Sequence, residues 1–511
     1  MKSRASTGSA RTVWGWIAAL LLATPSPAQD NLDVAAVGRS VVRVVVVSLE
    51  DGEPADIGTG SGIAVAPDKI LTNAHVLAAA AEGEAIIGVV PSEGRKRFTG
   101  RLIAYQPSKD LALIQLTDGR VEPATIATGP VPDGAAVAAL GYPFSVDRAR
   151  ELSAEGFVTP AAPVKSWGRV SGGQSSQRFD TVLHDASIGR GNSGGPLVDA
   201  CGRVGGVNSF VSNSEGVDAV FGFAVSVREI MPFLREAGVR PQTIGLPCRT
   251  GAEQDAIDDR LERSEAARAE AERNRATLSQ ERLAARRQQL RDEIAGDRDE
   301  GLAVAGILLV FGALFANGAM VLFAGGRRRP ALAAGSAGIL LMAGAPIAWV
   351  ARPDLDTVGQ RLAAEQPRTR TAAAADGPLV CRPDLERSRI TVSEPKQLAL
   401  DWSGQGCESG RTQYADADGR FERAEVLPGA ATVALRRFDP AAGRLTVERF
   451  FLGADTLAAA RALQGKYAAR SCGTESARAA GELNAALHDL LPTNPNERLV
   501  YACEARQDGA E

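Results

Sequence analysis

Three short motifs in the first half of the chain contain residue types that together can cleave an amide bond. His75 follows an apolar run, Asp110 stands at the start of another, and Ser193 lies in the glycine-rich run Gly-Asn-Ser-Gly-Gly. Acyl transfer at an amide needs a nucleophile, a base that accepts its proton, a group that orients the base, and N–H donors for the oxyanion. The sequence supplies a candidate for each part, in the chain order His, Asp, Ser.

This order and these motifs resemble the chymotrypsin-like serine proteases, most closely their HtrA/Deg branch, over roughly residues 37–239. The resemblance implies that His75 is the general base, that Asp110 orients its ring and that Ser193 is the nucleophile. It also implies that backbone N–H groups of Gly191 and Ser193 form the oxyanion hole. Glycine suits this turn because a residue without a Cβ lets the N–H groups point at the substrate.

Further runs follow the family's order along the chain, at residues 58–62, 141–144 and 220–225. Each could be only a strand with a turn, and it is their order that strengthens the resemblance. An active protease is therefore the favoured interpretation. The alternative hypothesis is a catalytically silent scaffold or sensor, in which the C-terminal domain binds a partner.

Several features differ from the family's pattern. Gly189-Arg190 stands where Asn-Pro is common, and His184 replaces a small hydroxyl residue. We expect Arg190 to face solvent and His184 to be a strand residue near the site, not a second base.

The PDZ domains of the branch are missing. The resemblance places the specificity pocket at Ser187-Ile188 and Val207–Ser209, where no acid is apparent, so cleavage beside a small or apolar residue is expected.

Short runs rich in Val, Ile and Ala, separated by turn residues, extend from Val41 to Val225. This pattern is typical of an all-β barrel or sandwich. With the resemblance, the expected fold is an all-β double β-barrel, as in chymotrypsin-like proteases, over residues 29–248. A helical period at Arg228–Ala237 predicts a helix that closes the domain.

The N-terminus has the features of an export signal. Basic residues precede the apolar stretch Val13–Ala23, and Ser26-Pro27-Ala28 places small residues where a signal peptidase cleaves. We expect residues 1–28 to be a cleaved signal peptide, with an uncleaved signal anchor as the alternative. Under either interpretation the protease region is exported.

Six cysteines fit an oxidising compartment. A bond between Cys201 and Cys248 would staple the segment after the nucleophile to the end of the protease domain. The other four allow three pairings, which the sequence leaves open: Cys381, Cys407, Cys472 and Cys503. No CxxC pair occurs, which disfavours zinc, and no metal or other cofactor is expected.

Residues 249–300 are rich in Glu, Asp, Arg, Gln and Ala, which predicts a solvated single helix or a weak coiled coil. Residues 301–351 then contain two apolar segments, 302–324 and 331–351, each long enough to cross a bilayer. We expect a transmembrane hairpin, with a buried helical pair as the alternative. The three arginines between the segments favour a cytoplasmic turn, which leaves the protease and the C-terminal domain outside the cell's inner membrane.

A linker at residues 352–377 leads to a second globular unit, residues 378–511. Alternating and helical patterns predict a small disulfide-containing α+β domain, with strand-like runs at Arg389–Val392, Gln397–Trp402 and Leu445–Phe451 and helical patterns at Thr456–Leu463 and Ser476–Leu491. The run from Tyr414 to Gly419 resembles part of a calcium loop, but Tyr414 stands where the first carboxylate should be. An Asp-Gly turn is the favoured interpretation.

The formal net charge of −4, without a basic stripe, argues against nucleic acid as a partner. The sequence therefore predicts a serine endopeptidase tethered to the bacterial inner membrane, with its protease and C-terminal domains facing the periplasm. Its expected substrates are exposed or misfolded envelope proteins or peptides. HtrA-like proteases are commonly trimers, which makes a homo-oligomer an open expectation.

Overall fold

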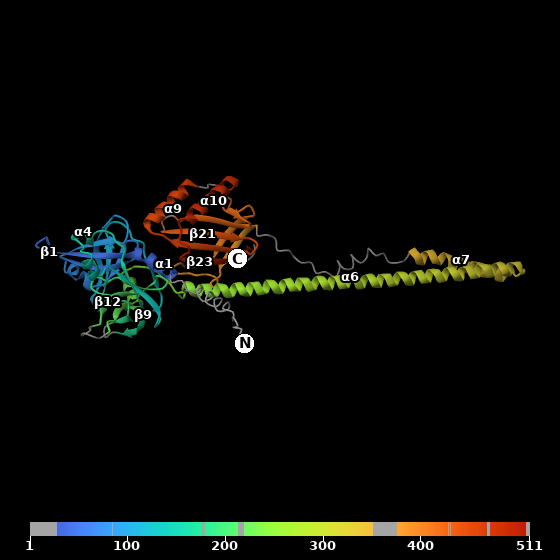
Figure 1. The fold of residues 1–511 in the computed structure, drawn as a ribbon, viewed down its shortest axis with the longest axis horizontal. Coiled ribbons are helices and arrows are strands. Elements are labelled where there is room, and N and C mark those ends of the chain that lie inside the picture. The colour runs from blue at the N-terminus through green and yellow to red at the C-terminus, as the bar shows by residue number, and fades with distance from the viewer. Residues whose placement is uncertain are drawn as a thin grey trace, which may run out of the picture. The chain divides into compact units, whose positions relative to one another are not determined.

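The computed structural model describes residues 28–83, 85–175, 179–212, 219–350, 376–427, 429, 431–467 and 471–506. The predicted signal peptide, residues 1–28, and the predicted linker, residues 352–377, lie outside these residues except for Ala28, Asp376 and Gly377. The chain forms two compact units (Figure 1). One unit combines the chain up to Asp259 with the chain from Ala373 onward, and the other is Arg260–Ala372.

A closed barrel of six strands forms the first half of the protease region, in the order β1-β2-β3-β6-β5-β4. Its strands are β1 (Val41–Glu50), β2 (Glu53–Ala66), β3 (Lys69–Thr72), β4 (Ala85–Pro91), β5 (Phe98–Gln106) and β6 (Leu111–Leu116). Alternate residues of β1, such as Val42 and Val44, pack with Ile70 and Ile114 inside this barrel. The barrel also carries α1 (Ala28–Val37) and η1 (Gly38–Ser40) before β1, and α2 (Ala78–Ala81) between β3 and β4.

A second closed barrel comes next along the chain, in which β11 pairs with both β8 and β12 to complete the ring β11-β8-β9-β10-β13-β12. Its strands are β8 (Ala136–Gly141), β9 (Val164–Ser175), β10 (Asp180–His184), β11 (Pro196–Asp199), β12 (Val204–Val211) and β13 (Gly222–Ser226). The short strands β7 (Thr125–Ala127) and β14 (Gln242–Ile244) extend the sheet beyond β12. Two barrels are therefore present, as the sequence predicted.

Helices complete the second barrel: α3 (Phe144–Ala149), α4 (Ala154–Phe157) and α5 (Val227–Glu236). The predicted closing helix is α5, which buries Ile230, Phe233 and Leu234 in a core that both barrels share. A buried ion pair also joins the barrels, since Arg43 of β1 contacts both carboxylate oxygens of Asp147 in α3, at 2.6 and 2.9 Å. Charges this deeply buried need such a partner.

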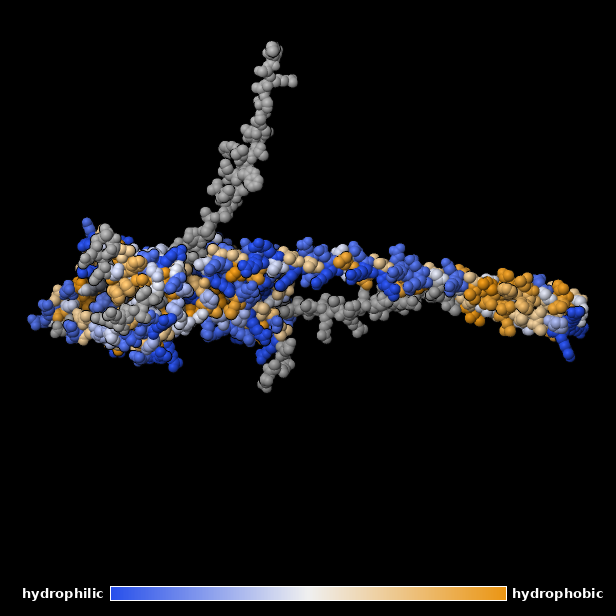
Figure 2. Space-filling model, turned by 90° about the horizontal axis from the view of Figure 1, so that it is seen from below, coloured by the Kyte–Doolittle hydropathy of each residue, from blue (hydrophilic) through white to orange (hydrophobic). Residues whose placement is uncertain are grey.

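The charged region and the first apolar segment form one continuous helix, α6 (Gly251–Ala324), because no proline interrupts them. Gly326, with φ +79°, ends the turn that leads to α7 (Arg328–Val350). A Cβ on Gly312 would meet the side chain of Met342, and one on Gly338 would meet Phe315, so the two helices pack antiparallel. Both contain a stretch long and apolar enough to cross a membrane, and apolar side chains cover the surface where α7 lies against α6 (Figure 2).

The C-terminal domain is a nine-stranded antiparallel sheet, in the order β18-β17-β16-β15-β23-β22-β21-β20-β19. Its strands are β15 (Gly377–Pro383), β16 (Leu398–Ser403), β17 (Cys407–Glu408), β18 (Thr412–Gln413), β19 (Ala415–Ala417), β20 (Arg420–Val426), β21 (Thr432–Asp439), β22 (Arg444–Phe451) and β23 (Glu497–Ala505). Helices α9 (Ala454–Lys466) and α10 (Thr474–His488) pack on it. Trp402 lies at the centre of its core, edge-on to three aromatic rings.

One predicted strand of this domain is wrong. Arg389–Val392 forms only a single bridge, between Arg389 and Arg498. The backbone N–H groups of Thr391 and Val392 donate to the carboxylate of Glu497 instead, at 3.0 and 2.7 Å, so they are not available to a neighbouring strand.

The run that resembles a calcium loop is a hairpin turn between β19 and β20. Asp418 and Gly419 both have positive φ, as a two-residue hairpin loop requires, and the Gly419 N–H donates to Asp416 at 2.8 Å. The favoured Asp-Gly turn is therefore confirmed.

Three disulfides join described residues. Cys201 bonds to Cys248, which is the expected staple at the end of the protease region. The other two bonds, Cys381 to Cys503 and Cys407 to Cys472, decide among the three pairings that the sequence left open.

Candidate active site

His75 and Asp110 lie together because the strands that carry them are paired. Thr72 at the end of β3 is opposite Ala112 in β6, so the residues just after β3 and those just before β6 share one edge of the first barrel. His75 begins the short helix η2 (His75–Leu77), and Asp110 ends η3 (Pro107–Lys109).

The contact between these two side chains is direct. Nδ1 of His75 lies 2.9 Å from each carboxylate oxygen of Asp110, and the backbone N–H of His75 donates to the same carboxylate at 3.1 Å. Asp110 itself has φ +53°, and its carbonyl accepts a hydrogen bond from Asn73 at 2.8 Å. The hydroxyl of Ser209 also donates to the Asp110 carboxylate. A proton held on Nδ1 leaves Nε2 of His75 as the basic nitrogen.

Ser193 belongs to the turn that precedes β11 of the second barrel. Its hydroxyl donates to the backbone carbonyl of Ser209 at 3.1 Å. Among the described residues, no hydrogen bond joins this hydroxyl to the ring of His75. The ring is half exposed, with 51% of its side chain accessible, so a substrate can approach it.

Two glycines of this turn have backbone conformations and surroundings that exclude a side chain. Gly191 has φ +93°, and a Cβ there would lie 2.2 Å from the carbonyl oxygen of Tyr142. Gly194 has φ +86°, and its Cβ would lie 2.1 Å from the carbonyl oxygen of Ser61. Only glycine fits either position without displacement of the backbone.

Two hydrogen bonds fix the direction of the peptide groups beside Gly191. The Arg190 carbonyl accepts from the Phe144 N–H at 2.8 Å, and the Gly191 carbonyl accepts from the hydroxyl of Ser61 at 2.7 Å. In a trans peptide the N–H points opposite to the carbonyl, so the Gly191 N–H points away from Phe144. Within the described part of the chain, neither this N–H nor that of Ser193 has an acceptor, which leaves both for an oxygen of a ligand.

Ser61 is the residue of this site whose role the sequence did not reveal. Besides its bond to Gly191, its hydroxyl accepts the Tyr142 N–H at 3.0 Å, and its own N–H donates to the Ser193 carbonyl at 2.8 Å. It is fully buried. The only signal in the sequence was its place in the glycine-rich run at residues 58–62, since a small polar residue there can lie close to another backbone.

The positions that differ from the family's pattern lie near this turn. Arg190 is exposed, as expected. His184 is the last residue of β10, also as expected, and is fully buried. Burial lowers the pKa of His184 to about 4, so its ring is neutral at pH 7. Asn208, from the expected pocket segment, supports the turn, since its carbonyl accepts the Gly194 N–H at 2.9 Å.

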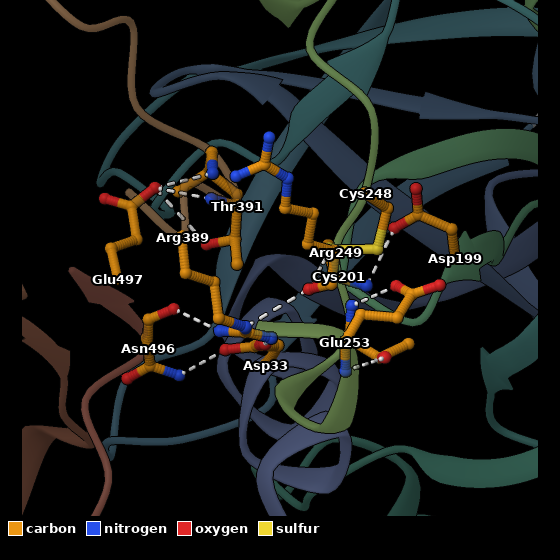
Figure 3. Close-up of polar contacts among 12 residues, drawn as sticks. Asp33, Asp199, Cys201, Cys248, Arg249, Glu253, Arg389, Thr391, Asn496 and Glu497 are labelled. Carbon is orange, nitrogen blue, oxygen red and sulfur yellow. Dashed lines mark hydrogen bonds and ion pairs between the residues drawn. A yellow bond between two sulfur atoms is a disulfide. The ribbon is translucent and has the colours of Figure 1, made fainter. Parts of the chain in front are cut away.

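One group of side chains among the described residues has the right types and spacing for a metal: Asp199, Cys201 and Cys248. The two sulfur atoms are bonded to each other (Figure 3), and Asp199 accepts the N–H groups of Cys201 and Arg203, both at 3.0 Å. Thiolates are the usual metal ligands of cysteine, and none is available here. These residues do not fit a metal ion.

Comparison with known proteins agrees with this geometry. Residues 60–207 match the trypsin-like peptidase domain family. This part of the chain thus matches a trypsin-like serine protease domain, and it is similar to HtrA-like proteases.

Three relatives show how far the similarity extends. The chain is 30% identical over 237 residues to serine protease Rv3671c of Mycobacterium tuberculosis, which covers 45% of this chain and 53% of that protein. It is 29% identical to serine protease Do-like HtrA of Bacillus subtilis, over 37% of this chain and 41% of the relative. It is 30% identical to periplasmic serine endoprotease DegP of Escherichia coli, over 32% and 33%. The matches thus span about half of these relatives or less.

Proposed function

We propose that the protein is a membrane-tethered serine endopeptidase that hydrolyses peptide bonds in exposed or misfolded proteins of the bacterial envelope. The observation that carries this proposal is the combination of the His75–Asp110 pair with two backbone N–H groups beside a serine hydroxyl, those of Gly191 and Ser193, which have no acceptor among the described residues. A nucleophile, an oriented base and an oxyanion site are the parts that acyl transfer needs.

In the proposed reaction, the Ser193 hydroxyl rotates from the Ser209 carbonyl to Nε2 of His75. Oγ attacks the carbonyl carbon of the substrate while its proton passes to Nε2, and the Gly191 and Ser193 N–H groups stabilise the oxyanion. His75 then gives this proton to the departing amine nitrogen, which leaves an acyl-enzyme. A water molecule then attacks the acyl carbon while His75 takes its proton. His75 returns this proton to the Ser193 oxygen as the acid is released. Asp110 stays ionised and stabilises the imidazolium.

The proposed substrate preference depends on the residues around the nucleophile. Ser187 and Ile188 precede the turn, and Asn208 supports it from β12. None of them carries a negative charge, so cleavage after Lys or Arg has no counter-charge there, and a small or apolar residue is the proposed choice.

The proposed location is the inner membrane, with the protease and C-terminal domains in the periplasm. The support is the pair of helices of spanning length, the arginines at the turn between them, and the disulfides in both globular parts. The turn would lie in the cytoplasm.

One observation favours the alternative of a silent protease-fold scaffold, namely that the Ser193 hydroxyl is bonded to the Ser209 carbonyl and not to His75. Labelling of the full-length protein in detergent with a fluorophosphonate separates the two. For an active protease we expect labelling of the wild type, none of Ser193→Ala, and labelling of Asp110→Asn slowed by up to ~10⁴-fold. A wild type that neither reacts nor cleaves unfolded protein, at any pH from 5 to 9, would reject the proposal.

A further inference from the structure

The protease domain and the C-terminal domain meet through buried charges (Figure 3). Asp33 of α1 lies 2.5 Å from a guanidinium nitrogen of Arg389, and its second carboxylate oxygen accepts from the Asn496 side chain at 2.8 Å. The side chains of Asp33 and Arg389 are only 1% and 3% exposed. Because separation of the domains would leave each of these charges without its partner, the contact favours one fixed arrangement.

The end of β14 and the chain that follows it strengthen this contact. Ile244 is buried in the hydrophobic core of the C-terminal domain, and Leu246 packs against the same core. Arg249, next to the disulfide of Cys248, donates to three backbone carbonyls of residues 385–388, at 2.8 to 3.1 Å. Apolar packing and hydrogen bonds therefore hold the two domains together beside Asp33.

A cavity of about 690 Å³ lies between the two domains, next to these contacts. The end of α1, the residues before β7 and the strand β14 form one wall, and residues 391–396 with β21 and β22 form the other. Its volume is within the range of small-molecule sites, which often occur between domains. The lining includes the hydroxyl residues Ser40, Thr125 and Thr432, together with Phe451.

Most charges that line this cavity are already paired within the protein. Asp33 binds Arg389, Arg449 lies 3.1 Å from Glu497, and Lys396 lies 3.2 Å from Glu394. These pairs leave no net charge to attract a ligand.

Two lining charges differ, because Arg39 and Glu122 form no ion pair in the described part of the chain. Among the described residues, the Arg39 side chain donates one long hydrogen bond, 3.3 Å, to the Phe451 carbonyl, and its buried Nε has no partner. Burial lowers the pKa of Arg39, an effect that the charges of Glu93 and Glu122 partly oppose. Burial also raises the pKa of Glu122, which the charge of Arg39 partly opposes, although Glu122 remains accessible to solvent. The cavity therefore presents one cation and one anion that a ligand can neutralise.

We propose that this cavity binds a small zwitterionic ligand, an amino acid or short peptide, whose carboxylate contacts Arg39 and whose ammonium contacts Glu122. A guanidinium and a carboxylate form charge-assisted hydrogen bonds with these groups, and the hydroxyls of the lining suit the peptide group between them. Arg39 and Glu122 both belong to the wall that the protease domain forms, and a ligand that also reaches Thr432 or Phe451 on the other wall binds the docked state of the domains and stabilises it. This role does not depend on catalysis at Ser193.

Isothermal titration of the full-length Ser193→Ala protein in detergent tests the proposal, with alanyl-alanine as the probe. N-acetyl-alanyl-alanine lacks the ammonium, and alanyl-alanine amide lacks the carboxylate. We expect alanyl-alanine to bind and each modified peptide to bind roughly 10- to 100-fold more weakly, since each loses a hydrogen bond between charged groups. These probes test the site without any change to its residues.

Variants then assign the two charges. Arg39→Gln should remove the preference for the free carboxylate, and Glu122→Gln the preference for the free ammonium. Arg101→Gln, at an exposed arginine of β5, is the matched control and should change neither preference. Absence of alanyl-alanine binding at concentrations on the order of 10 mM would overturn the proposal. Equal affinity for all three peptides would overturn it too. So would the loss of either preference in Arg101→Gln.

Discussion

Ser61→Ala tests how the backbone on the C-terminal side of Gly191 supports the oxyanion site. The change removes one buried hydroxyl, which donates to the Gly191 carbonyl at 2.7 Å and accepts the Tyr142 N–H at 3.0 Å. Both backbone groups belong to buried residues. Each loses its partner, at about 1–3 kcal/mol per group, so we expect the free energy of unfolding to fall by about 2–6 kcal/mol.

The effect on catalysis has a separate limit. Without the Ser61 hydroxyl, the peptide between Gly191 and Asn192 loses the bond that fixes its carbonyl. The Gly191 N–H belongs to the preceding peptide, whose carbonyl the Phe144 N–H still holds, so the change reaches this N–H only through rotation about the Gly191 Cα. One such donor contributes ~10²–10³-fold to kcat, which sets the largest loss that we expect from this variant. The loss should be in kcat with little change in KM, because the donor acts mainly on the transition state.

The assay combines peptide hydrolysis and fluorophosphonate labelling with urea denaturation, at a temperature where the variant is folded. Ser226→Ala is the matched control, because Ser226 is also buried but its hydroxyl caps α5 at Arg228, away from the turn. It should lose stability, by about 1 kcal/mol, and keep its kcat. If Ser61→Ala keeps the wild-type kcat while its stability falls, Ser61 supports only the fold and the reasoning is wrong.

Three other substitutions have defined outcomes. Phe144→Pro removes the N–H that holds the Arg190 carbonyl, at the first position of α3, where proline is tolerated, and it also removes an exposed ring that lies beside Arg148. Hydrolysis should slow by ~10-fold or more with the helical circular dichroism unchanged, and Phe144→Ala, which loses the ring but keeps the N–H, should slow it less. His184 has a pKa near 4 in the folded protein and about 6.5 when unfolded, so the unfolded state binds more protons between these values. The free energy of unfolding should therefore fall as the pH drops from 7 to 4, and urea titrations of His184→Thr should show a smaller fall. The double variant Cys201→Ser, Cys248→Ser loses the disulfide, and its free energy of unfolding should fall by about 4 kcal/mol for a loop of this length. The thermal midpoint should fall with it. Equal midpoints with and without the bond would contradict this prediction.

The catalytic candidates could be read from the sequence because each lies in a short motif whose neighbours are local. His75 follows a strand end, Asp110 precedes a strand, and Ser193 needs only glycines beside it. The double barrel was predicted through the same motifs, although the exact ends of its strands depend on pairing, as where β2 continues from Glu53 to Ala66.

Other features could not be predicted, because they depend on residues far apart in the chain. Ser61 contacts a carbonyl that lies 130 positions later, and Asp33 contacts a guanidinium 356 positions later. The run Arg389–Val392 has the composition of a strand, but the buried carboxylate of Glu497 takes its N–H groups. Local pattern predicts what a segment can form, and a distant charge decided what this one forms.

The ion pair between Arg43 and Asp147 has a consequence for engineering. His75 and Asp110 come from one barrel and Ser193 from the other, and this pair is among the contacts that fix the barrels against each other. A chimaera that exchanges one barrel for that of a relative would separate the arginine from its carboxylate. Such exchanges should therefore yield a folded protease only when Arg43 and Asp147 come from the same parent. The two barrels should then be exchangeable only as a single unit.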